Sequence, residues 1–168
     1  MRKLQLLTLI LCLLPPIAAA QIIAGSPEDK AFQQLMAETN ADAKLQKLVD
    51  FEKSFPRSKA LSNVYLMVIE IYRGKNEPDK IIEYGEKVLT LDAHNVTAMM
   101  VLSRNYAIKR VNLDRAVELA QKAVDEVGRM RSTPPPSTQT EAQWKSYLDS
   151  TEVAARGILS YTMSIRGD

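Results

Sequence analysis

Two stretches of the 168-residue chain, DKIIEYGEKVL at residues 79–89 and DRAVELAQKAV at residues 114–124, follow one pattern. Each begins with an acid and a base, continues with two apolar residues and Glu, and ends with Lys and two apolar residues. Within each stretch the apolar residues recur three and four positions apart, which places them on one face of a helix. The pattern therefore predicts one helix that occurs twice, 35 residues apart.

A second match lies upstream of each of these helices. SNVYLMVIEIYRGK at residues 62–75 is followed 34 residues later by VTAMMVLSRNYAIK at residues 96–109. The first is rich in β-forming residues and could be a strand by itself, whereas the second contains Ala, Met, Leu and Arg and indicates a helix. Because the two stretches match, both are predicted to be helices. The matched positions are Tyr65 with Met99, Val68 with Leu102, and Tyr72 with Tyr106.

A unit of two helices that recurs every 34 or 35 residues resembles the tetratricopeptide (TPR) repeat. The residues just named meet the first-helix pattern of that family, but Ile69 replaces its small residue, and Gly85 and Ala120 replace its second-helix aromatic residue. The resemblance implies an all-α fold, an α-solenoid of TPR-like helix-turn-helix repeats wound into a right-handed superhelix. Such arrays are stabilised by contacts between neighbouring repeats and present a concave face.

The rest of the chain divides around these repeats. Ser26 with Pro27 is typical of a helix start, Pro56 ends a helix, and Thr140 with Gln143 predicts a capping box. The last segment leaves two alternatives open, a capping helix or a chain that is a piece of a longer array. The predicted organisation is an extended lead-in at 21–27, a divergent helical hairpin at 28–57, TPR-like repeats at 58–95 and 96–130, a Pro-rich insertion at 131–140, and a C-terminal helix or the start of a further repeat at 141–168.

The first residues, MRKLQLLTLILCLLPPIAAAQ at 1–21, have the pattern of a secretory signal peptide. Arg2 and Lys3 precede an apolar stretch, and three alanines at 18–20 supply the small residues that a signal peptidase needs. The alternative is an uncleaved membrane anchor, but the apolar core is shorter than the roughly 20 residues that span a bilayer. We therefore predict a signal peptide at 1–20, cleaved after Ala20, and an exported protein that is periplasmic or secreted.

Cys12, the only cysteine, lies in this predicted leader. Leu11 stands before it where a bacterial lipoprotein signal has a small residue, so lipidation is not favoured. Without Arg2 and Lys3, the number of basic residues falls from 22 to equal the 20 acidic ones. A neutral chain has no electrostatic attraction to nucleic acid or to an anionic membrane. We expect no nucleic-acid partner and no stable membrane insertion after cleavage.

In TPR proteins a groove is lined by first-helix residues that face away from the packing positions. Chaperone-binding members hold a peptide carboxylate there with Lys and Asn, but Leu66, Glu70 and Met100 occupy those positions here, so that clamp is not expected. The alternative is that these are ordinary solvated or inter-helix positions. The candidate protein-binding residues are Asn63, Leu66, Glu70, Arg73, Thr97, Met100, Arg104, Ile108 and Tyr161, with Ala154 and Ile165 on the same face of the last helix.

Residue types that carry out catalysis or bind metals are sparse. His94 is the single histidine, and it lies in a predicted turn without a cysteine or an acidic cluster at ligand spacing. No glycine-rich phosphate loop occurs in the sequence. We therefore expect no enzyme activity, no metal and no cofactor.

Together these features predict a non-catalytic protein–protein interaction scaffold or adaptor in the cell envelope. It would bind a protein or peptide partner, as a peptide or helix, in the concave groove, and self-association is a further option. The alternative is a structural N-terminal TPR array, one piece of a larger envelope protein whose effector lies downstream.

Overall fold

The computed structural model describes residues 22–168, and the predicted signal peptide at residues 1–20 lies outside them. Within the described residues the chain forms seven α-helices and no β-strand. The prediction of an all-α fold is confirmed for this part of the chain. None of these helices combines the length and the apolar character needed to cross a membrane.

The helices begin and end close to the positions that the sequence pattern predicts. The second repeated stretch, at residues 114–124, lies within a longer helix that continues to residue 130, where the predicted repeat also ends. The elements are α1 (Pro27–Ala37), α2 (Ala41–Ser54), α3 (Leu61–Gly74), α4 (Pro78–Leu91), α5 (Val96–Lys109), α6 (Leu113–Met130) and α7 (Glu141–Arg166).

Local side chains determine where several helices begin. At the start of α1, the Ser26 hydroxyl accepts a hydrogen bond of 3.1 Å from the backbone N–H of Asp29. At the start of α7, Thr140 and Gln143 form the predicted capping box. These bonds satisfy N–H groups that have no partner inside the helix, so such starts can be predicted from local sequence.

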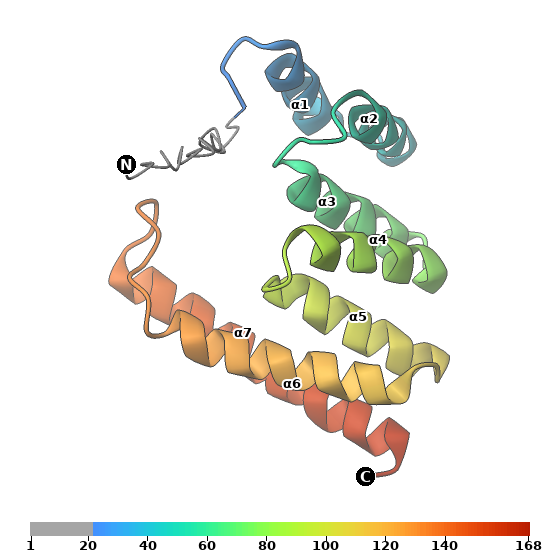
Figure 1. The fold of residues 1–168 in the computed structure, drawn as a ribbon, viewed down its shortest axis with the longest axis vertical. Helices are drawn as coiled ribbons and strands as arrows, with labels where there is room; N and C mark the ends of the chain where they lie inside the picture. The colour runs from blue at the N-terminus through green and yellow to red at the C-terminus, as the bar shows by residue number, and fades with distance from the viewer. Residues whose placement is uncertain (1–21) are drawn as a thin grey trace, which may run out of the picture.

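Each helix packs against the next one along the chain, and α7 also contacts α5. Figure 1 shows the resulting array, which runs from α1 and α2 through α3, α4 and α5 to α6 and α7. Packing between neighbours in sequence is typical of an α-solenoid. The chain is thus a helical array of that general kind.

The core consists of two apolar clusters. One is formed by α1 to α4 with part of α5, and the other by α5, α6 and α7. Leu89 packs against both clusters and so connects them. The apolar positions that match between repeats lie in these clusters: Tyr65, Val68 and the half-buried Tyr72 in the first, and Met99, Leu102 and Tyr106 in the second.

The two departures from the TPR pattern in the first repeat are both accommodated by packing. Ile69 is only 1% exposed and belongs to the first cluster. Gly85 lies against Leu102, and a Cβ atom at residue 85 would be 2.8 Å from the Leu102 Cγ and Cδ2 atoms. The space beside residue 85 is thus filled by the Leu102 side chain of α5, which packs closely against α4.

Acids in the first turns of α2, α4 and α6, two of which begin the repeated stretches, connect neighbouring helices through ion pairs. In each pair, an acid in the first turn of one helix binds a base at or just after the C-terminal end of the following helix. Both positions are favourable for the helix dipole. The pair between α6 and α7 has the same arrangement as the pair between α4 and α5. The pairs are Asp42 with Lys75, Asp79 with Lys109, and Asp114 with Arg166.

Candidate protein-binding groove

A hollow of about 570 Å³ lies between α3, α5 and α7, with the start of α4 at one end. A second hollow of about 490 Å³ lies between α5 and α7. Arg104 and Ile108 of α5 and Ala154 and Ile158 of α7 line both hollows, which therefore form one continuous groove. Its size is that of sites that bind small ligands or short peptide segments.

The groove brings together most of the residues that the sequence predicts for it. Asn63 and Leu66 of α3 are not among the lining residues, and Leu66 packs instead against the first apolar cluster. Ile165 also lies outside the lining. The predicted residues that line the groove are Glu70, Arg73, Thr97, Met100, Arg104, Ile108 and Tyr161, together with Ala154.

Seven lining residues were missed by the prediction: Asn76, Pro78, Ile81, Val101, Asn105, Gly157 and Ile158. Val101 and Asn105 directly follow the predicted Met100 and Arg104 in sequence. A helix that forms one side of a groove presents a stripe more than one residue wide. A broader stripe along α5 would therefore have included Val101 and Asn105.

The groove is mainly apolar and contains few charges. Ile108 is 52% exposed and Tyr161 is 41% exposed, so large apolar surfaces face solvent. Glu70 and Arg73 form a salt bridge of 3.0 Å and neutralise each other. Arg104 forms no salt bridge with any other residue between 22 and 168, which leaves one uncompensated positive charge among the lining residues.

A half-buried polar network positions α5 behind the groove. The Tyr106 hydroxyl donates a hydrogen bond of 2.6 Å to Glu86 of α4, and Arg115 of α6 donates to the same carboxylate at 2.6 Å. Burial and this carboxylate raise the pKa of Tyr106. Burial by itself would raise the pKa of Glu86, but the hydrogen bonds from Arg115 and Tyr106 lower it overall. One charged carboxylate thus connects three helices.

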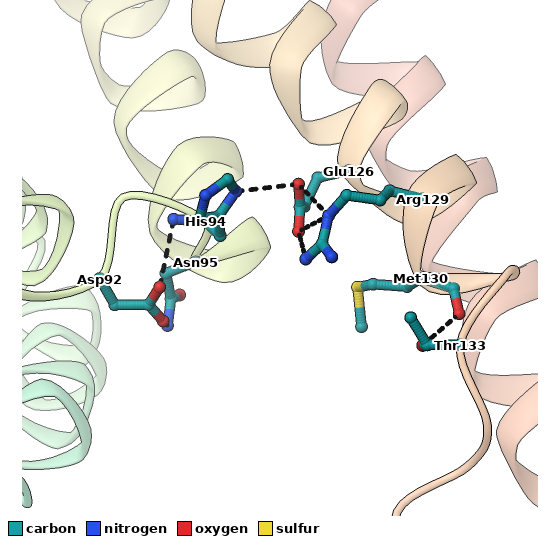
Figure 2. A network of polar contacts seen from close by, with 7 residues as sticks. All are labelled: Asp92, His94, Asn95, Glu126, Arg129, Met130 and Thr133. Atoms are coloured by element: carbon teal, nitrogen blue, oxygen red, sulfur yellow. Dashed lines mark hydrogen bonds and ion pairs between the residues drawn. The ribbon is translucent and has the colours of Figure 1, made fainter.

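A second network connects the turn before α5 to the end of α6 (Figure 2). The exposed His94 ring lies with Nδ1 3.1 Å from a carboxylate oxygen of Glu126, which is 8% exposed. Arg129 donates to the same carboxylate from the other side. The hydrogen bond from Arg129 is the main reason that the pKa of Glu126 lies below its usual value. His94 is in a turn, as predicted, but its contact with α6 could not be predicted from spacing.

Among residues 22–168, no group of three or more His, Cys, Asp or Glu side chains is arranged to hold a metal ion. The chain matches no model of a protein family, and no curated protein matches it.

Proposed function

We propose that this chain is a protein-interaction module, a TPR-like α-solenoid whose groove between α3, α5 and α7 binds a peptide or helical segment of another protein. The observation that carries this proposal is the groove itself, with its apolar lining and exposed Ile108 and Tyr161. Exposed apolar surface in a concave site is typical of positions that receive a partner.

The cell envelope is the proposed location, and the leader-like residues 1–20 support it. We further propose that the repeats belong to the TPR class. The 34- and 35-residue periods and the position of α7, which pairs with α6 as α5 pairs with α4, support this assignment.

Affinity capture from an envelope extract of the source organism tests the proposal. The wild-type protein is compared with a Met100→Glu/Ile108→Glu variant, which places two carboxylates among the lining residues. The matched control is Thr90→Glu/Gln121→Glu, which adds the same charge at exposed positions of α4 and α6 that do not line the groove. Circular dichroism establishes that all three proteins are folded.

If the groove is the binding site, the wild type and the control capture the same partner, and the Met100→Glu/Ile108→Glu variant does not. Equal retention by all three proteins would place the binding surface elsewhere and contradict the proposal. Retention by none would favour the alternative of a structural array.

A further inference from the structure

Arg104 has an unusual environment for a charged residue of this chain. It is exposed on α5 at the position where the two hollows of the groove meet. Most arginines in the described part of the chain bind a carboxylate on their own helix or a neighbouring segment. Arg57 and Arg110 also have no ion pair within residues 22–168, but both lie in turns. The paired residues are Arg73, Arg115, Arg129, Arg131, Arg156 and Arg166.

The surroundings of Arg104 in the groove are largely apolar. Met100 and Ile108 lie one helical turn before and after it on α5, and Ile158 and Tyr161 of α7 line the same hollow. A segment that fills the groove would remove water from the guanidinium group. A charge that loses water without gaining a partner raises the free energy of the complex. A carboxylate would remove this penalty, because it can form two parallel hydrogen bonds with arginine.

We propose that the segment bound in the groove carries an Asp or Glu side chain between apolar residues, and that Arg104 binds its carboxylate. This inference rests on the proposed function and specifies the class of partner. The apolar residues of the segment contact Met100, Ile108 and Ile158, and the acidic side chain determines its position along α5. A basic residue at the same place would face Arg104 and weaken binding.

The probes are three pools of peptides of about 12 residues with randomised apolar positions, long enough for two helical turns of anchors. The pools differ only in one fixed central residue, which is Glu, Gln or Lys. Binding of each pool is measured by fluorescence anisotropy with protein expressed from the full sequence. The variant is Arg104→Glu, and the matched control is Arg57→Glu, which changes another exposed arginine without an ion pair among the described residues.

The Glu pool is expected to bind the wild type about tenfold more tightly than the Lys pool. In Arg104→Glu this order reverses, and in Arg57→Glu it does not change. Equal binding of all three pools to the wild type, or an unchanged order in Arg104→Glu, would overturn the inference. Failure of every pool to bind would also overturn it, because the pools sample the proposed class.

The Met100→Glu/Ile108→Glu variant distinguishes failure of this inference from failure of the proposed function. If that variant weakens all pools equally while Arg104→Glu has no effect, the groove binds peptides without charge selection. If neither variant changes the binding of any pool, the groove is not the binding site, and the proposed function fails with the inference.

Discussion

Glu126 illustrates how a single residue can connect segments that are distant in sequence. Its carboxylate is buried on α6 and binds Arg129 on the same helix and His94 in the turn before α5. An i,i+3 partner such as Arg129 can be predicted from spacing, but His94 cannot, because 32 residues separate it from Glu126. The same limit applies to Lys87, which lies 3.8 Å from Glu83 on its own helix but 3.0 Å from Glu52 on α2.

The first prediction concerns Glu126→Gln. We expect this change to lower the free energy of unfolding at neutral pH by about 1 kcal/mol, since it removes the charge from a buried hydrogen-bonded group. The pKa of Glu126 is lowered in the folded protein, so its stabilising contribution is complete above the ordinary pKa of 4.5 and is lost as the pH falls through the lower folded value. The difference between wild type and variant should therefore shrink in acid.

Urea unfolding of both proteins, at neutral pH and in steps down to about pH 3.5, measures this difference. The control is Glu118→Gln, which removes an exposed pair with Lys122 and should cost less stability than Glu126→Gln. If the difference in unfolding free energy between the wild type and Glu126→Gln grows as the pH falls, the stabilising role assigned to the charged Glu126 carboxylate is contradicted.

At the scale of elements, the helices were largely predictable from sequence and their contacts were not. Caps such as Ser26 and the Thr140 capping box act over three or four residues, so local sequence contains them. Helix–helix contacts depend on residues far apart. Gly85 departs from the repeat pattern, and the Leu102 side chain that lies against it belongs to the next helix.

The second prediction tests this contact between α4 and α5. Gly85→Ala would gain up to about 1 kcal/mol of helix propensity but places a methyl group 2.8 Å from Leu102 atoms. Overpacking typically costs about 1–3 kcal/mol, so we expect a net loss of stability in chemical denaturation. Gly128→Ala in α6, where a Cβ atom meets nothing within 4 Å, should instead stabilise the protein.

A Leu102→Ala background provides the decisive comparison for Gly85. With the Leu102 side chain shortened, the added methyl group has room, and Gly85→Ala should become neutral or stabilising. An equal loss of stability in both backgrounds would show that the contact with Leu102 is not the cause.

For the whole molecule, the N-terminal end of the array is packed less firmly than α5 and α6. α1 buries only Leu35, and α2 buries Leu48 and Phe51, whereas α5 and α6 each bury many more residues. In an array held by nearest-neighbour contacts, segments with fewer buried contacts open at lower free energy. The sequence indicated this difference only indirectly, as weaker agreement of residues 28–57 with the repeat.

The third prediction follows from this gradient. In native-state hydrogen exchange, backbone amides of α1 should exchange at least about tenfold faster than those in the middle of α5 and α6. Mass spectrometry of peptides from each helix measures the rates. Equal protection of α1 and α5 would show that the array opens as one cooperative unit.

The candidate groove also belongs to the scale of the whole molecule, because it exists only where α3, α5 and α7 meet. The resemblance to TPR repeats predicted eight of its fifteen lining residues. It did not predict the extent of the groove. Asn63 and Leu66 have the right phase but lie outside the lining, and Ile158 of α7 lines both hollows.

Site-specific photocrosslinking in living cells of the source organism tests groove binding most directly. A photoreactive amino acid replaces Ile108 in the groove or, as the control, the exposed Gln121 on α6. If a partner binds in the groove, the photoreactive group at residue 108 gives a defined crosslinked species, and the group at residue 121 gives none. Crosslinks from both positions, from residue 121 only, or from neither would contradict binding in the groove.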